Sequence, residues 1–171
     1  MASTYEKIET TTLGSATNSV TFSSISGSYT DLVLISSYRG TTTSGAYQAI
    51  RFNGDSGSNY SHTFIYGGQS GDPQGSARNA NITHFYGNTT GGSMSTNRTG
   101  FTQNVLYIMN YSNTVTFKTG ILRGGHAETN TDMLVQMWRS TSAITSITSI
   151  ADGAGNFAAG STFTLYGILK A

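Results

Sequence analysis

Three histidines are the residues of this chain best suited to acid–base or metal chemistry. They are His62, His84 and His126, and they lie far apart in the sequence. Zinc centres commonly show closely spaced ligand pairs such as the HExxH motif, and the sequence contains no such pair. Convergence of the three side chains in space is an alternative that their spacing does not support. The sequence therefore predicts neither a metal site nor any other cofactor.

The carboxylates and serines also lack a catalytic arrangement. Acid–base catalysis by carboxylates needs two of them in one site, and the chain has only eight aspartates and glutamates. Asp31 and Asp132 each precede an apolar run, where we expect an edge or turn role. No Gly-x-Ser-x-Gly elbow occurs, and the absence of cysteine excludes a thiol nucleophile, a disulfide and a thiolate metal site. We therefore predict that the protein is not an enzyme.

The run Asp55–Asn59, with the sequence DSGSN, has the oxygen-rich composition of a calcium-binding loop. Calcium sites use several carboxylates, however, and this run offers only one. The Asn-Gly pair directly before it tolerates positive φ, which a tight chain reversal requires. Alternation in the flanking residues places Ile50 and Phe52 on one strand face and Arg51 on the other. We therefore predict a strand–turn–strand hairpin over residues 47–66 rather than an ion site.

Small polar residues dominate the composition and favour β structure. The chain contains 27 threonines, 23 serines, 12 asparagines and 21 glycines, whereas only 10% of its residues are charged. Threonine and tyrosine favour strands, and the scarcity of lysine and glutamate disfavours helices. Ten tyrosines and eight phenylalanines, with a net charge of +1, are atypical of disordered chains. A chain of 171 residues is therefore predicted to form one all-β domain with a substantial core.

The charge pattern argues against several classes of partner. The nine basic residues lie singly between Lys7 and Lys170, without the cluster that nucleic-acid phosphates require. No apolar stretch approaches the roughly 20 residues of a membrane span. The opening sequence MASTYEKIETTT lacks the apolar core of a secretory leader. We expect a protein made in a cytoplasm, with neither nucleic acid nor a membrane as its partner.

Short alternating runs recur along the chain, separated by turns of glycine, asparagine and serine. This pattern is typical of an antiparallel β-sandwich of the jelly-roll type, with about nine to ten strands. The unbroken apolar run Leu32–Ile35 predicts burial on both strand faces or a central position in a sandwich. Besides the hairpin, the predicted strands span residues 19–25, 31–38, 101–111, 115–122, 133–138, 145–150 and 163–169.

Two regions fall outside this pattern. Residues 1–12 are polar apart from Tyr5 and Ile8, and we predict an N-terminal arm or edge strand there. Residues 67–100 carry the only proline of the chain and repeated glycine and asparagine, so we predict a long exposed loop region. Residues 13–171 are otherwise expected to form a single domain.

Three segments of the sequence resemble a family of small virion proteins. They are the opening MASTYEKIETTTLGSATNSVTFSSISGSYTDLVLISS, the central RFNGDSGSNYS and the closing STFTLYGIL. The resemblance is to structural proteins of phages that infect cyanobacteria and marine bacteria. It covers the two ends and the centre of the chain but not residues 67–100. It implies a jelly-roll structural protein of the virion, often a trimer, and carries no catalytic residues.

Two functions are compatible with this resemblance. The first is a capsid decoration or cement protein that forms a homo-oligomer, a trimer, and binds the major capsid protein or other virion proteins. A surface poor in charge suits this role, because its burial desolvates few ions. The alternative is a tail-associated receptor-binding module that recognises host surface polysaccharide through tyrosines on exposed loops. Either role places the protein in the virion, with Tyr5, Ile8 and Tyr86 as candidate partner contacts.

Overall fold

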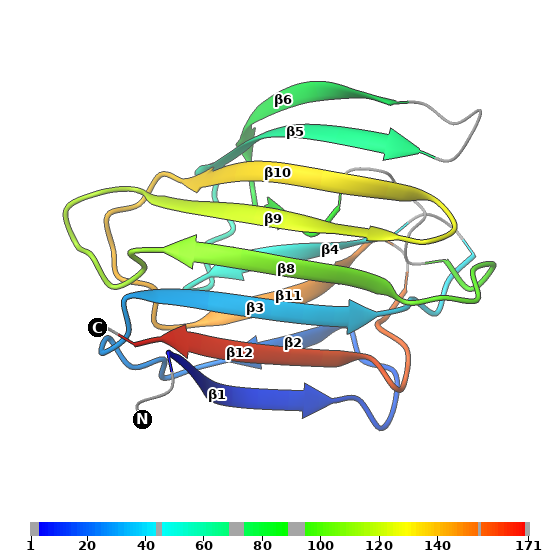
Figure 1. The fold of residues 1–171 in the computed structure, drawn as a ribbon, viewed down its shortest axis with the longest axis horizontal. Helices are drawn as coiled ribbons and strands as arrows, with labels where there is room; N and C mark the ends of the chain where they lie inside the picture. The colour runs from blue at the N-terminus through cyan, green and yellow to red at the C-terminus, as the bar shows by residue number, and fades with distance from the viewer. Residues whose placement is uncertain (1–3, 44–45, 69–73, 89–94, 154, 170–171) are drawn as a thin grey trace.

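The protein forms two antiparallel β-sheets packed face to face (Figure 1). The computed structural model describes residues 4–43, 46–68, 74–88, 95–153 and 155–169. These residues include no helix, so no helix among them is long and apolar enough to cross a membrane. The all-β antiparallel class expected from the sequence is confirmed. The described residues form twelve strands, whereas nine to ten were predicted.

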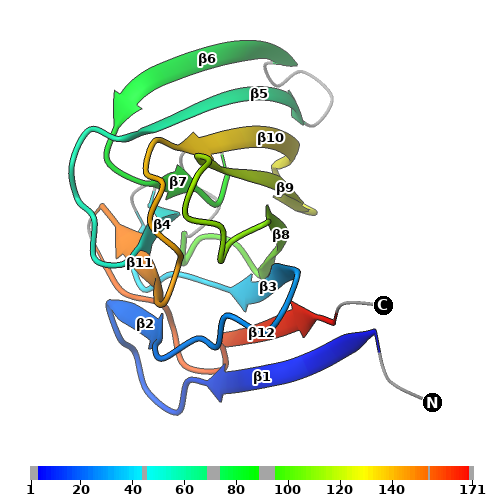
Figure 2. The same cartoon turned by 90° about the vertical axis from the view of Figure 1, so that its left-hand side faces the viewer.

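The strands differ in length from two to nine residues. In chain order they are β1 (Tyr5–Thr12), β2 (Ser19–Phe22), β3 (Asp31–Tyr38), β4 (Tyr47–Phe52), β5 (Tyr60–Gly68), β6 (Gln74–Ile82), β7 (Phe85–Tyr86), β8 (Thr102–Met109), β9 (Lys118–His126), β10 (Asn130–Trp138), β11 (Ile147–Asp152) and β12 (Thr162–Ile168). The larger sheet has the order β1-β12-β3-β8-β9-β10-β5-β6, and the smaller one has the order β2-β11-β4-β7. Figure 2 shows the smaller sheet lying along one side of the larger sheet.

The chain folds as nested antiparallel pairs centred on the β5–β6 hairpin. Moving outward from that hairpin, β4 pairs with β7, β3 with β8, β2 with β11 and β1 with β12. Successive pairs alternate between the two sheets, and each step outward crosses from one layer to the other. The β9–β10 hairpin fills the space between β8 and β5 in the larger sheet.

Period-two alternation explains how the sheets enclose a core. In β8, for example, Leu106 and Ile108 are fully buried while Gln103 and Met109 are exposed. The largest core side chains are aromatic and come from both sheets. They are Phe22, Tyr38, Phe52, Tyr60, Phe85, Tyr111, Trp138, Phe157 and Phe163. Several of their rings meet edge to face, including Phe52 and Phe85 at 4.9 Å between centroids.

A polar network crosses the core between the sheets. The Gln48 side chain in β4 donates to the hydroxyls of Ser36 in β3 and Ser149 in β11, both at 3.0 Å. Asn104 in β8 donates to the Gln48 carbonyl at 3.1 Å and to the Tyr38 hydroxyl at 2.9 Å. All five residues are buried, so these bonds satisfy groups that water does not reach. The network therefore joins the two layers at one defined relative position.

Residues 47–66 form strand, turn and strand, but not the predicted hairpin. β4 belongs to the smaller sheet and β5 to the larger one, so the turn carries the chain between layers. Arg51 does lie on the opposite face from the buried Ile50 and Phe52. The Asn-Gly turn has positive φ at both residues, 53° and 70°. The turn chemistry was predicted, but local sequence cannot tell a turn within a sheet from one between sheets.

Asn53 also fastens this turn to a distant loop. Its side-chain oxygen accepts bonds from the backbone N–H groups of Thr145 and Ser146, and its amide donates to the Ala143 carbonyl. We expect Asn53→Gly to lower the free energy of unfolding by about 1–2 kcal/mol, because glycine keeps the positive φ but loses these bonds. Urea unfolding monitored by circular dichroism measures this change.

Asn110 provides the matched control for this substitution. It has a φ of 52°, and its side chain makes no hydrogen bond within the described part of the chain. Asn110→Gly should therefore change the free energy of unfolding by less than about 0.5 kcal/mol. Equal losses in the two variants would show that the Asn53 side chain adds nothing beyond its backbone conformation.

Residues 67–100 contain two strands where we predicted a long loop. β6 and β7 lie within this region, while residues 69–73 and 89–94 fall outside the described chain. β6 pairs with β5 at the edge of the larger sheet, and all of its residues but the last are exposed. A strand with no buried face carries no apolar alternation, so the sequence QGSARNANI gave no strand signal.

Candidate functional site

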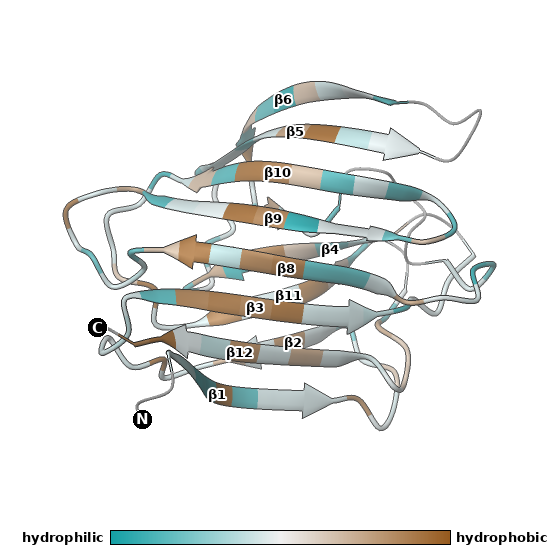
Figure 3. Cartoon of the chain, viewed as in Figure 1, coloured by the Kyte–Doolittle hydropathy of each residue, from teal (hydrophilic) through white to brown (hydrophobic). Residues whose placement is uncertain are grey.

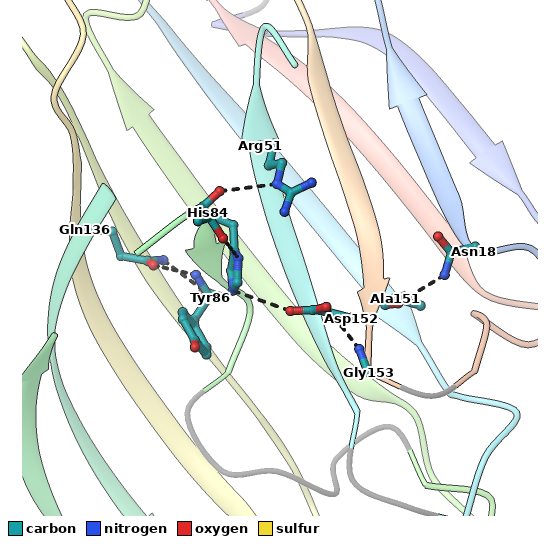
Figure 4. Close-up of polar contacts among 9 residues, drawn as sticks. Asn18, Arg51, His84, Tyr86, Gln136, Ala151, Asp152 and Gly153 are labelled. Atoms are coloured by element: carbon teal, nitrogen blue, oxygen red, sulfur yellow. Dashed lines mark hydrogen bonds and ion pairs between the residues drawn. The ribbon is translucent and has the colours of Figure 1, made fainter. Parts of the chain in front are cut away.

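His62 and His84 both pack against one tyrosine. The ring centroid of Tyr86 in β7 is 4.7 Å from the centroid of each histidine. Tyr47 stacks on Tyr86 at 4.7 Å, and Asp152 at the end of β11 approaches the His84 ring, with 3.8 Å between Oδ2 and Nε2. Figure 4 shows His84, Tyr86 and Asp152 brought together from β7, the segment before it and β11. We call these five residues the histidine–tyrosine cluster.

Backbone contacts hold this cluster in place. The Gln136 side chain in β10 accepts a bond from the Tyr86 N–H at 2.7 Å and donates to the Tyr86 carbonyl at 2.9 Å (Figure 4). Arg51 donates from Nε to the Thr83 carbonyl at 3.2 Å. The short strand β7 is thus tied both to the larger sheet and to its own neighbour β4.

Both histidines are buried and favour the neutral form. Burial, and then the nearby His84 ring, lower the pKa of His62 to about 4. Burial also lowers the pKa of His84, although the Asp152 carboxylate opposes this shift. His62 Nδ1 and His84 Nε2 have no hydrogen-bond partner among the residues that the structure describes. A buried neutral imidazole is a packing and acceptor group at neutral pH rather than a charge.

The cluster has part of the geometry of a catalytic triad but not its chemistry. The Thr83 hydroxyl lies 3.1 Å from His84 Nδ1, and Asp152 lies beyond Nε2. A nucleophile needs a base able to take its proton near neutral pH, whereas His84 has a lowered pKa and is enclosed by Tyr47 and Tyr86. We interpret the cluster as a structural clamp between the strands.

The remaining candidates for chemistry take part in local structure. His126 lies at the end of β9, where its Nδ1 accepts a bond from the Glu128 N–H. Asp55 accepts bonds from Gly57 N–H and from the Trp138 indole, as expected of a turn residue rather than a calcium ligand. No group of three metal-binding side chains occurs among the residues that the structure describes.

The outer face of the larger sheet is the most unusual surface of the molecule. We use outer face for the side of this sheet that points away from the smaller one. Large apolar side chains lie on it in the open: Ile65 is 58% exposed, Val135 50%, Met133 48% and Ile35 39%. The register pairs Ile65 with Met133 across β5 and β10, whereas Ile35 lies three strands from Met133, beyond Arg123 and Val105. Figure 3 shows hydrophobic residues forming a band across β3, β8, β9, β10 and β5.

The outer face carries few charges. Its charged residues are Lys7, Asp31, Arg78 and Arg123. Lys7 and Arg78 belong to β1 and β6, the two edge strands, whereas Arg123 in β9 lies near the centre. Soluble antiparallel sheets with one open face usually cover it with charged and polar residues. An eight-stranded face that is instead apolar at its centre indicates a surface built for contact.

Tyrosines connect the central arginine to the β1 edge. The Arg123 guanidinium lies 6.0 Å from the centre of the Tyr107 ring, a cation–π distance. Tyr107 is hydrogen-bonded to Tyr5, which also meets the Tyr166 ring edge to face at 6.5 Å. Val33 pairs in register with both Tyr107 and Tyr166 and is only 2% exposed. The one central charge is therefore already engaged with an aromatic ring.

Two adjoining hollows indent this face where β5 and β9 end. They have volumes of about 600 Å³ and 510 Å³ and share Gly67, Arg123 and Thr131 in their linings. Ile65 and Met133 line the smaller hollow, and Gln103 and Asn130 line the larger one. Because a side chain at Gly67 would point into open space, this glycine leaves the hollow uncovered.

The structure separates the three predicted contact residues. Tyr5 lies on the outer face and is 46% exposed. Ile8 packs against the core, and both belong to β1, so the described part of residues 1–12 is an edge strand rather than an arm. Tyr86 lies in the histidine–tyrosine cluster of the smaller sheet, not on a free loop. Tyr5 is therefore the only one of the three on the apolar outer face.

Sequence reasoning missed the outer face although the signal was present. The apolar run Leu32–Ile35 predicted burial on both strand faces or a central position in a sandwich, and the run Met133–Trp138 has the same character. In the structure only one face of these strands is covered, which leaves Ile35 and Met133 exposed. The expectation of two buried faces is therefore not met in the single chain.

Comparison with known proteins does not change this description. No protein-family model matches the sequence, and no curated protein matches it. The function must therefore be argued from the geometry of the outer face and from the resemblance seen in the sequence.

Proposed function

We propose that this chain is a structural protein of a phage virion, and that it decorates or cements the capsid. The observation that carries the proposal is the wide, apolar and charge-poor outer face of the larger sheet. Such a face binds a flat protein surface with little desolvation of ions. The resemblance of three sequence segments to phage virion proteins supports the same role. On this proposal the protein works without catalysis and without a cofactor.

The proposal includes a jelly-roll topology. Its support is the nesting of strand pairs about the β5–β6 hairpin, with successive pairs alternating between layers. A jelly roll is a double sheet of this kind built from two Greek keys. On this reading β9 and β10 are an added hairpin, and β1 and β12 extend the larger sheet. The resemblance further implies a trimer, which we retain as part of the proposal.

The proposed mechanism is additive. Each copy binds only the assembled shell, so binding stabilises that shell against disassembly by mass action. Oligomers multiply the contacts, because the second and third contacts of one oligomer form at high effective concentration. Many modest contacts over the whole shell then resist internal pressure. No single residue of the interface needs to contribute a large free energy.

The copy number of the chain in purified particles tests this function. We expect a ratio to the major capsid protein within a few-fold of one to one, because a cement protein covers the shell. Quantitative mass spectrometry of purified virions measures the ratio. A ratio nearer one to a hundred would move the protein to the tail, and complete absence from particles would overturn the virion role.

The alternative is a tail-associated module that binds host surface polysaccharide. The observation that favours it is the pair of hollows on the outer face, with Gln103 and Arg123 as polar groups and tyrosines nearby. Tyrosine rings and amides are typical sugar-binding groups. Glycan-array binding that is lost in Arg123→Ala would support this role. Failure of the purified chain to bind any host envelope glycan would count against it.

A further inference from the structure

We propose that the outer face packs against the outer face of a second copy of this chain. The contact is a two-fold one, in which the same strands of both copies meet face to face. The inference rests on the part of the proposed function that makes the outer face an interface, and it names the partner. It does not depend on whether the assembled protein then joins a capsid or a tail, and where both proposals hold the oligomer contacts the shell through another surface.

Two strands of the larger sheet are apolar on both faces, although only their inner face is covered in the single chain. An antiparallel sheet with one open face alternates apolar and polar residues. In β10, however, Met133 and Val135 point outward while Leu134 is fully buried on the inner side. In β3 the outward Ile35 follows the inward Leu34 in the same way. Strands with two apolar faces are those of a sheet buried on both sides, so a second layer is expected on the outer face.

The area of the outer face matches the area that a protein interface buries on each partner. Eight strands at about 4.8 Å spacing, each about eight residues long, give a face of roughly 1,000 Å². A standard protein interface buries about 800 Å² on each partner. The outer face alone is therefore large enough for a stable dimer. Sheets packed face to face lie about 10 Å apart, close enough for outward side chains of this size to interdigitate.

The few charged residues of the outer face allow it to meet its own copy. A two-fold contact places like residues near one another, so a face with several central charges of one sign would repel its copy. Here Arg123 is the only charge near the centre, and its guanidinium already lies against the Tyr107 ring, whereas Asp31 is the first residue of β3 and lies at one end of that strand. The other cations, Lys7 and Arg78, lie on the edge strands, where they stay in water. The charges of the outer face therefore do not oppose contact with the same face of a second copy.

A single charged substitution at the centre of the face tests the contact. Wild-type protein should show a native mass that is an even multiple of 18.1 kDa by sedimentation velocity at micromolar concentration: a dimer, or a hexamer if two of the proposed trimers meet through the outer face. Met133→Glu should halve that mass, because it would bury two unpaired carboxylates in the contact. Met133 is 48% exposed in the single chain, so the folded monomer accommodates the glutamate.

Val115→Glu is the matched control. Val115 is 79% exposed and lies in the β8–β9 connection, away from the outer face. This variant should keep the wild-type mass, and both variants should keep the wild-type circular dichroism spectrum. A wild-type mass of 18.1 kDa or of an odd multiple would overturn the two-fold contact, as would an unchanged mass for folded Met133→Glu.

The virion role can fail separately from this contact. An oligomer that forms through Met133 but is absent from particles would leave the inference standing and remove the proposed function. A monomer that is abundant in particles would do the reverse, because another virion protein would then cover the outer face.

Discussion

Acidification below neutral pH should remove about 3 kcal/mol from the free energy of unfolding, chiefly through His62. Burial and the neighbouring His84 ring lower the pKa of His62 from 6.5 to about 4 in the folded chain. Between these two values the unfolded chain binds a proton that the folded chain does not. Stability is therefore fully present above about pH 6.5 and falls steadily until about pH 4. The lowered pKa of His84 acts in the same direction.

Urea unfolding at a series of pH values measures this slope. His62→Phe keeps an aromatic ring between Phe64 and Tyr86 but has no titrating group, so it should flatten the curve between pH 6.5 and 4. His126→Phe is the control, because His126 lies outside the cluster, and it should keep the part of the slope caused by His62. If His62→Phe kept the wild-type dependence of the free energy of unfolding on pH, His62 would not be the source of that dependence.

Asp55 changes the stability at lower pH than the histidines do, so the two effects can be told apart. Burial opposes its ionisation, but hydrogen bonds from Trp138, Asn59 and Gly57 outweigh this and lower its pKa below the ordinary 3.8. The stability that Asp55 contributes is therefore lost only as the pH falls through this lowered pKa. Asp55→Asn should remove the slope in that acid range and leave the slope of the histidine range unchanged, although the whole curve lies lower at higher pH.

Gln48→Leu should lower the free energy of unfolding by about 3–4 kcal/mol. Leucine fills a similar volume, but it leaves the buried groups of Ser36, Ser149 and Asn104 without their partner. No water reaches these groups, because all three residues are at most 2% exposed. Each unsatisfied group costs about 1–3 kcal/mol, and the effects act together within one network. The midpoint of urea unfolding measures the loss.

Gln103→Leu is the matched control for this substitution. Gln103 also donates a side-chain hydrogen bond, to the Ser37 hydroxyl at 2.8 Å, but this bond is exposed to water. Its loss should change the free energy of unfolding by less than about 0.5 kcal/mol. Comparable losses for the two variants would mean that the network between the sheets contributes no more than a surface bond.

Sequence reasoning reached the fold class because alternation and turn residues act locally. β3 was predicted with its observed bounds, and the Asn-Gly turn after β4 has the expected positive φ. β6 was missed because it buries neither face, so its pairing with β5 leaves no apolar period in the sequence. The crossing from β4 to β5 depends on which strand each one pairs with, and those partners lie far along the chain.

The candidate site was predictable in part. Tyr5 was named as a contact and lies on the outer face, whereas the inward Ile8 serves the core. His62 and His84 approach Tyr86 from β5 and from the segment before β7, and no spacing in the sequence predicts this meeting. The outer face combines residues of eight strands, so only the register of the sheet shows that their apolar side chains are neighbours.

The central claim is that the outer face is covered in the assembled protein, and cysteine labelling tests it most directly. The chain has no cysteine of its own, so Met133→Cys and Val115→Cys each provide a single thiol. Both positions are exposed in the single chain, at 48% and 79%. In purified particles that contain the protein, we predict fast maleimide labelling of Val115→Cys and strong protection of Met133→Cys. Similar labelling rates for the two variants in particles would contradict the account, because the outer face would then be open to solvent.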